Sequence, residues 1–233
     1  MKALLKITII LFLSNLLLGC KKKNVEKVID NTNRQQMDAF STKKGSWTLL
    51  SSDDGSVFYR YATSETRDIK GLKMEYFYRL DTTSVMKEKI PEYYGKFDGK
   101  YLSMIDLDGT SKDYINFVYF KEGFTTGMSW YNEEKEIIQG WNLVMGIDSK
   151  ILNDNESLMV NGKIYDNVIH VFNNLKARLA IMPTMVDCGD LEIWYKKGIG
   201  IIKNKGNIKI APAGVTLVEK VYSDQILDYH LEP

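Results

Sequence analysis

Apolar and polar residues alternate along most of the chain after residue 45, which is the period of a β-strand with one buried face. The clearest run is KMEYFYRL at 73–80, where Met74, Tyr76, Tyr78 and Leu80 share one face. The spacing predicts an antiparallel meander of about ten to thirteen strands with little helix, as in barrels and sandwiches. The turn signals that separate these runs supply the positive φ angles of tight hairpins: Asp53-Asp54-Gly55, Asp98-Gly99, Asp108-Gly109, Glu122-Gly123 and Asn161-Gly162.

Two of the expected strands, 113–121 and 164–172, are apolar on both faces. A sheet that is apolar on both sides needs cover on both sides. That cover can be a second sheet, a helix, a membrane or a bound apolar ligand. Because no repeat, low-complexity tract or Pro/Gly-rich linker divides the region, we expect one antiparallel β domain over 45–233.

The first 19 residues have the pattern of a secretory signal. A short basic start, with Lys2 and Lys6, precedes an apolar stretch over 7–18. About 12 residues at 1.5 Å rise give roughly 18 Å, which is too short for the ~30 Å hydrocarbon core of a bilayer. The stretch ends in Leu17-Leu18-Gly19-Cys20, which closely resembles the bacterial lipobox.

That resemblance implies cleavage between Gly19 and Cys20, a diacylglycerol on the Cys20 sulfur and an acyl chain on its new amino group. One chain of myristoyl length anchors only marginally, whereas two or three chains anchor stably. We therefore expect a membrane partner through the lipid at Cys20 and a polar, flexible tether over 20–44. In Gram-negative lipoproteins, an aspartate directly after the lipidated cysteine resembles a signal for retention in the inner membrane. This chain has Lys21 at that position. The expected place is therefore the periplasmic face of the outer membrane. The alternative is the outer face of the cytoplasmic membrane.

A second resemblance concerns the C-terminal part of the chain. The segments 162–171, GKIYDNVIHV, and 194–203, WYKKGIGIIK, resemble the C-terminal hairpins of envelope lipoproteins related to the Lol-type lipoprotein carriers. The family's fold is a single curved antiparallel sheet, an open half-barrel whose concave face holds acyl chains in the true carriers. The resemblance implies this fold, while cargo transport does not follow from it.

The overall charge argues against a nucleic-acid partner, and the cysteine and histidine positions do not indicate catalysis. The 31 basic and 30 acidic residues nearly cancel, so we expect no nucleic-acid binding, which needs a concentrated basic face. Cys188 has acidic neighbours and no nearby base, so it is expected to be structural or incidental. His170 alternates with apolar residues on a strand, and His230 lies near the terminus, so neither is expected to be a catalytic base.

No residues have the spacing of a metal or cofactor site. The acidic cluster over 106–113, DLDGTSKD, partly matches a calcium loop, but its glycine is fourth instead of sixth and no glutamate occupies the twelfth position. A hairpin tip with solvated carboxylates is the favoured interpretation. We therefore expect no metal, no cofactor and no catalytic centre.

The sequence favours a membrane-anchored, non-catalytic envelope lipoprotein that can bind an apolar small molecule or lipid in its β half-barrel. The alternative is a structural or interaction subunit of an envelope protein assembly. A third hypothesis, a hydrolase that uses carboxylates such as Asp106 or Glu133, has no positive support in the sequence.

Overall fold

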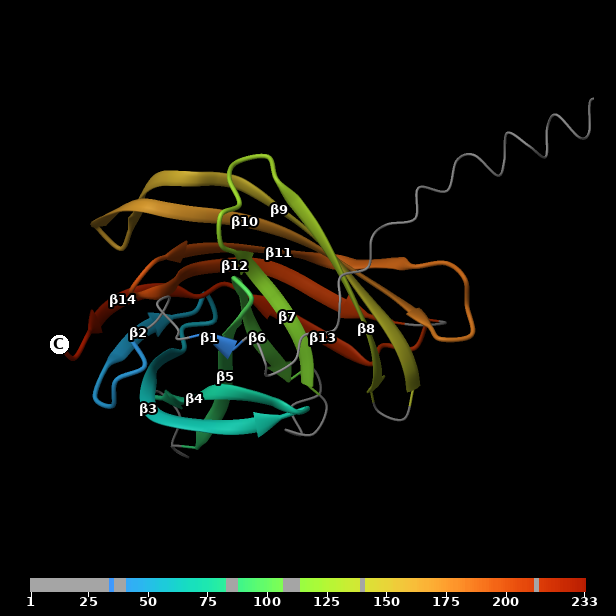
Figure 1. The fold of residues 1–233 in the computed structure, drawn as a ribbon, viewed down its shortest axis with the longest axis horizontal. Coiled ribbons are helices and arrows are strands. Elements are labelled where there is room, and N and C mark those ends of the chain that lie inside the picture. Colours follow the sequence, from blue (N-terminus) through green and yellow to red (C-terminus); the bar gives the residue numbers. More distant parts are fainter. Residues whose placement is uncertain (1–33, 36–40, 83–87, 107–113, 139–140, 212–213) are drawn as a thin grey trace, which may run out of the picture.

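The computed structural model describes residues 34–35, 41–82, 88–106, 114–138, 141–211 and 214–233. Within these ranges the chain forms strands and no α-helix (Figure 1). The strands are β1 (Arg34–Gln35), β2 (Trp47–Ser51), β3 (Val57–Ile69), β4 (Leu72–Asp81), β5 (Lys89–Phe97), β6 (Lys100–Asp106), β7 (Tyr114–Lys121), β8 (Ser129–Ile138), β9 (Trp141–Val160), β10 (Lys163–Leu179), β11 (Val186–Lys196), β12 (Gly200–Ile210), β13 (Val218–Tyr222) and β14 (Gln225–His230). The prediction of a mainly β protein is confirmed, with more strands than the expected range. The predicted leader, Gly19 and Cys20 lie outside the described residues.

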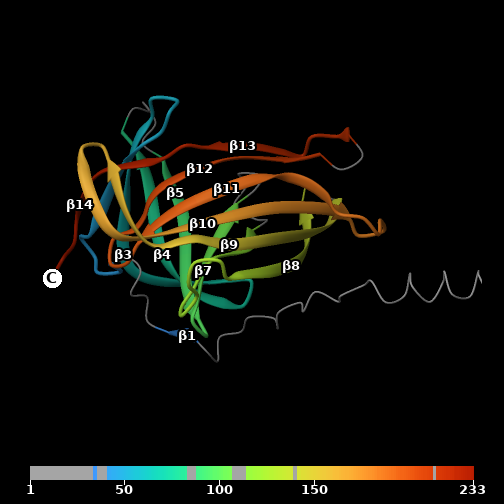
Figure 2. The ribbon, with the colours of Figure 1, turned by 90° about the horizontal axis from the view of Figure 1, so that it is seen from above.

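All paired strands are antiparallel and belong to one sheet. Its order is β7-β6-β5-β4-β3-β2-β14-β12-β11-β10-β9-β8, with β1 on β5 and β13 on β12. The C-terminal strand β14 joins β2 to β12, so the first and second halves of the chain form one continuous surface (Figures 1 and 2). The sheet curls further than a half-barrel, into a nearly closed barrel with one unsealed seam between β7 and β8.

The predicted turns have the backbone that tight hairpins need. The β5–β6 turn has positive φ at Asp98 and Gly99, and the β9–β10 turn has positive φ at Asn161 and Gly162. Two successive positive φ values match the twist of a two-residue hairpin. Gly55 and Gly123 also have positive φ, as the sequence predicts, and Asp108-Gly109 lies outside the described residues.

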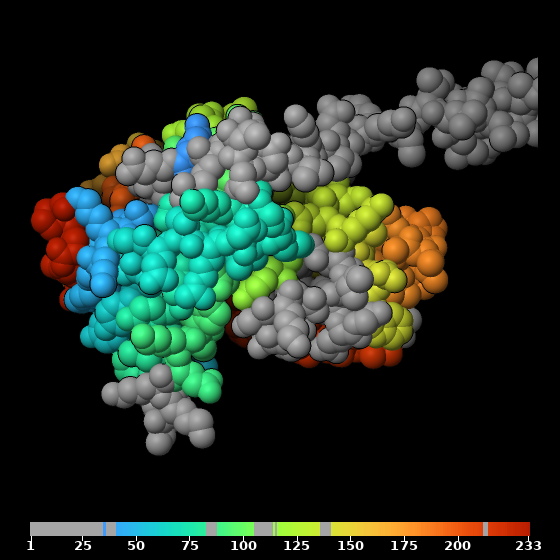
Figure 3. Space-filling model, turned by 60° about the horizontal axis from the view of Figure 1, so that its bottom comes forward, coloured from blue at the N-terminus to red at the C-terminus, as the bar shows by residue number. Residues whose placement is uncertain are grey.

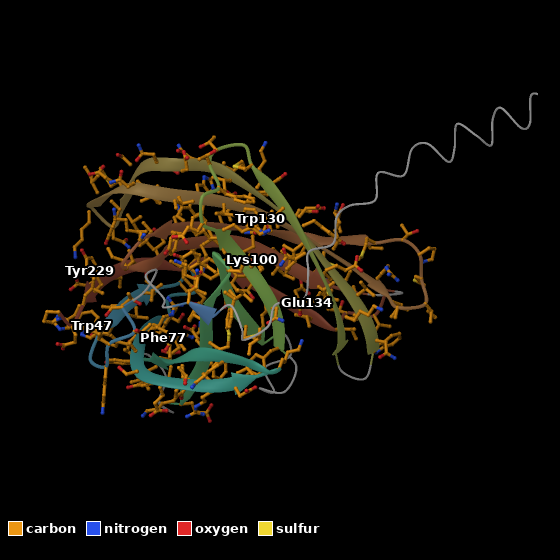
Figure 4. The ribbon with its side chains drawn as sticks, viewed as in Figure 1. Trp47, Phe77, Lys100, Trp130, Glu134 and Tyr229 are labelled. Atoms are coloured by element: carbon orange, nitrogen blue, oxygen red, sulfur yellow. The ribbon has the colours of Figure 1, made fainter. Side chains whose placement is uncertain are left out.

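Side chains bridge the seam where backbone pairing stops. The Trp130 Nε1–H of β8 donates to the Val118 carbonyl of β7 at 3.3 Å. Further along, the Asn116 N–H donates to Glu134 Oε2 at 3.2 Å, and Lys70 Nζ lies 3.7 Å from the same carboxylate oxygen. Trp130 and Glu134 lie along β8 beside β7 (Figure 4). These contacts satisfy part of an edge that would otherwise expose unpaired backbone groups.

Aromatic rings fill the interior between β6, β7 and β11. The Tyr195 ring centroid lies 6.0 Å from that of Tyr101, 6.1 Å from Tyr119 and 5.4 Å from Phe120. Since β11 is far from β6 and β7 in the sheet order, these rings meet across the barrel. All four side chains are buried. The barrel's own opposite wall therefore covers the inward face of the strand that the sequence predicts at 113–121.

A charged pair lies beside these rings, with Arg60 buried and Glu92 half-buried. The Arg60 guanidinium donates to both carboxylate oxygens of Glu92, and its carbon lies 5.6 Å from the Tyr94 ring centroid. The Tyr94 hydroxyl donates to Glu92 at 3.2 Å. Burial alone would raise the pKa of Glu92, but the Arg60 charge and hydrogen bond lower it below its ordinary value. The carboxylate thus stays ionised inside the barrel.

Candidate ligand pocket

A pocket of about 380 Å³ lies at one end of the long sheet, away from the aromatic interior. Its walls come from the end of β10, the β10–β11 connection, the start of β11 and the end of β12. In the space-filling view the β10–β11 connection, in orange, forms one end of the molecule (Figure 3). The lining is mostly apolar and consists of Ala177, Arg178, Leu179, Met182, Thr184, Val186, Asp187, Cys188, Gly189, Asn207, Lys209 and Ala211.

Two glycines allow β11 and β12 to approach closely beside this pocket. A Cβ atom at Gly189 would lie 1.9 Å from the Asn207 carbonyl oxygen, and one at Gly206 would lie 2.2 Å from the Asp190 carbonyl oxygen. Gly189 also has a φ of +115°, a conformation that L residues rarely adopt. The β10–β11 register shifts next to Gly189 and leaves Cys188 as the extra residue of a β-bulge. The bulge and the glycines together shape the pocket wall.

Arg178 organises the connection that borders the pocket. Its Nη1 donates to the carbonyl oxygens of Met182 at 2.7 Å and Ala180 at 3.1 Å, with a longer contact to Leu179 at 3.5 Å. The Met182 N–H donates to the Leu179 carbonyl at 2.9 Å. Because the arginine satisfies these carbonyls internally, the connection keeps a defined shape without a neighbouring strand.

The buried Cys188 thiol faces conditions that favour its neutral form. Burial raises the pKa of this thiol to about 11, although a backbone hydrogen bond from Ala177 acts in the opposite direction. Its Sγ–H contacts the Val186 carbonyl at 3.5 Å. A neutral thiol is a weak nucleophile. It contributes an apolar surface to the pocket instead.

Both histidines contact neighbouring side chains. The His170 ring stacks on Trp194 with centroids 4.2 Å apart, and its Nε2 forms a hydrogen bond with Glu192 at 2.7 Å. His230 lies 3.2 Å from Glu232 near the C-terminus. Neither imidazole lines the pocket.

Among the carboxylates considered for catalysis or metal binding, the structure describes the side chain of Glu133. Asp106 ends β6, and the rest of its loop lies outside the described residues. The Glu133 carboxylate accepts a hydrogen bond from the Tyr131 hydroxyl at 2.9 Å. Across the described part of the chain, no three histidine, cysteine or acidic side chains are grouped to hold a metal ion.

Sequence reasoning missed the pocket because its walls come from three strands whose ends are not marked by charge or motif. The β10–β11 connection itself carries a sequence signal, which is its lack of charge. Residues 180–186, AIMPTMV, contain no charged side chain, and neither do residues 211–217, APAGVTL. Two uncharged connections at neighbouring strand ends are unusual for surface loops, which are mostly polar. In the described ranges, no helix is long and apolar enough to cross a bilayer.

The chain is an antiparallel β-barrel protein with a pocket at one end, and a solved structure has a similar fold. No family model and no curated protein matches the chain. The fold is similar to that of a crystal structure at 2.70 Å from Parabacteroides distasonis, described as a "putative lipoprotein". The sequences are 13% identical, the TM-score is 0.50, and the match covers 84% of this chain and 100% of that chain. At this identity the likeness shows the fold alone.

Proposed function

We propose that this chain is a membrane-anchored envelope lipoprotein without a catalytic centre, whose barrel binds an apolar small molecule or lipid. The observation that carries the anchoring is Leu17-Leu18-Gly19-Cys20, with Cys20 as the lipid attachment residue. The fold neighbour, whose description is "putative lipoprotein", supports the same class. The favoured place is the periplasmic face of the outer membrane.

The ligand site is the end pocket rather than the barrel interior. The rings around Tyr195 pack against one another in the interior between β6, β7 and β11. The pocket of about 380 Å³ falls within the size range of small-molecule sites, which are mostly apolar with a few polar groups. Its walls fit that description, because Leu179, Met182 and Val186 line it beside Arg178.

Anchoring is tested by labelling cells with an alkyne analogue of palmitate and recovering the protein. The parent chain should carry label, and Cys20→Ser should carry none and keep its leader. Cys188→Ser is the matched control, because it removes the other cysteine. Label that persists in Cys20→Ser would contradict the anchor.

Ligand binding is tested by native mass spectrometry of the processed chain with Cys20→Ser, purified without detergent and then extracted with organic solvent. We expect an additional mass that extracts as a lipid. A clean unliganded mass, even after incubation with phospholipid and fatty acid, would contradict the pocket as a ligand site.

A second function, an interaction subunit of an envelope assembly, has its own observation. A row of aromatic rings crosses β2, β3 and β4: Trp47 to Tyr59 at 5.3 Å, Tyr59 to Tyr61 at 5.4 Å, and Tyr61 to Tyr78 at 5.1 Å. These rings are half-buried, and Trp47 lies at the end of the molecule near Tyr229 (Figure 4). Photo-crosslinking from position 61 in intact cells should recover a protein neighbour, and recovery equal to that from exposed position 205 would oppose this function.

A further inference from the structure

The exposed apolar side chains of the pocket end gather on two neighbouring connections. Ile181 is 90% exposed, Val186 65% and Met182 42% on or beside the β10–β11 connection, and Val215 is 50% exposed on the β12–β13 connection. Since β10, β11, β12 and β13 are consecutive in the sheet, both connections leave the same end. Met182 and Val186 also line the pocket, so its wall continues into the exposed patch. Contiguous apolar surface of this kind marks a protein or membrane contact.

The backbone of this end is prepared for an apolar environment. The Arg178 guanidinium satisfies carbonyls of the β10–β11 connection, and the Leu217 N–H donates to the Ile210 carbonyl at 2.8 Å. Polar backbone groups cost free energy in lipid unless they are paired within the protein. Both connections also lack charged side chains.

The opposite end of β9 and β10, at the hairpin that joins them, differs in its exposed apolar residues and in its charge. Its exposed apolar residues Met159 and Ile164 are direct cross-strand partners, so they pack against each other. Beside them Lys163 Nζ pairs with Asp228 at 2.8 Å, which places an ion pair at the hairpin tip. A charged tip is a poor surface for the bilayer interior.

The proposed lipid anchor makes the membrane the expected partner of this apolar end. Arg34 lies fourteen residues after Cys20, and an extended chain spans at most ~3.6 Å per residue, which gives a reach of about 50 Å. A domain held within that distance of the bilayer can present either end to it. The end around Ile181 has two neighbouring connections without charged side chains, and the charged residues that flank the β12–β13 connection, Lys209 and Glu219, pair with each other at 3.0 Å.

We infer that the end formed by the β10–β11 and β12–β13 connections, with Ile181 at its tip, rests in the surface of the membrane that holds the lipid anchor. This inference rests on the proposed function. It places the mouth of the pocket at the bilayer. The proposed ligand is therefore a membrane lipid that enters the pocket directly from the membrane surface.

The test uses the processed chain, residues 20–233, coupled through Cys20 to a maleimide phospholipid in vesicles of phosphatidylethanolamine and phosphatidylglycerol. Buried Cys188 does not compete for the maleimide. Ile181→Trp and the matched control Met159→Trp are compared in vesicles whose acyl chains carry bromine. Circular dichroism checks that both variants are folded.

The emission added by Ile181→Trp should fall about twofold or more, and that added by Met159→Trp should stay unchanged within error. Equal quenching at both positions, or none at position 181, would overturn the inference. Protection of position 181 from acrylamide without vesicles, rising with protein concentration, would show that a second copy covers this end and would also overturn it. Because the anchor is supplied chemically, a failure of lipidation in cells leaves this result unaffected.

Discussion

Tyr195 and Cys188 lie on the same strand, β11, yet their surroundings differ. Three rings from β6 and β7 pack around Tyr195, whereas Cys188 lies beside a pocket of about 380 Å³. The ends of β10 and β11 extend past β5, β6 and β7 in both ribbon views (Figures 1 and 2). One sheet therefore fills its core where an opposite wall exists and leaves a pocket where none does.

The largest expected effect comes from emptying the filled region. Tyr195→Ala removes a ring that packs against three others, so the free energy of unfolding should fall by about 3–5 kcal/mol. Tyr229→Ala, at the exposed end of β14, should change it by no more than about 0.5 kcal/mol. Urea denaturation measures both, and equal midpoints would contradict a packed interior.

The next effect concerns the backbone that shapes the pocket. Gly189→Ala should lower the free energy of unfolding by about 2–4 kcal/mol, because its Cβ meets the Asn207 carbonyl and its φ is positive. Gly162→Ala has positive φ but open space around it and should cost about 1 kcal/mol. If the two variants unfold alike, the close approach of β11 and β12 is not required.

The reactivity of the Cys188 thiol reports whether this residue of the pocket wall is shielded from solvent. The pKa of Cys188 is raised from 9.0 to about 11, so about a hundredfold less thiolate is present near neutral pH. Alkylation by iodoacetamide at pH 8, followed by mass spectrometry of the Cys20→Ser chain, should be slow in the folded protein and fast in urea. Rapid folded-state alkylation would place this thiol outside the wall.

The buried ion pair gives the interior a pH dependence. The pKa of Glu92 is lower in the folded chain than its ordinary value near 4.3, so its stabilising effect is complete above that value and is lost as pH falls through the folded pKa. Glu92→Gln should destabilise the protein by about 1–3 kcal/mol at pH 7 and flatten its stability below pH 4. Asp190→Asn, on an exposed side chain, is the control.

The smallest expected effect on stability is at the pocket rim. Val186→Glu places a charge at the pocket, and Val221→Glu places one at an exposed position of β13 outside the pocket lining. Both should change the free energy of unfolding by less than about 0.5 kcal/mol. Only Val186→Glu should reduce lipid uptake, several-fold, in the native mass measurement, and equal uptake by both would argue against the pocket.

Much of the fold could be predicted from local pattern, and the site could not. The alternation at 73–80 and the turn at Asn161-Gly162 are local signals, and both correspond to elements of the structure. The closure by β14 between β2 and β12 depends on contacts across the whole chain, which periodicity does not encode. The pocket depends on how far β10 and β11 project beyond their cover, and single-strand patterns carry no information on that.

The most direct test of a filled interior and an open end uses the methionine methyl groups as reporters. Met74 and Met145 are buried in the core, Met182 lines the pocket, and Met159 is exposed at the opposite end. In methyl-labelled protein titrated with a short-chain phospholipid below its micelle concentration, NMR should show a saturable shift at Met182, with Met74, Met145 and Met159 unchanged. Shifts at Met74 and Met145 without one at Met182 would contradict the account, because they would place the lipid inside the barrel.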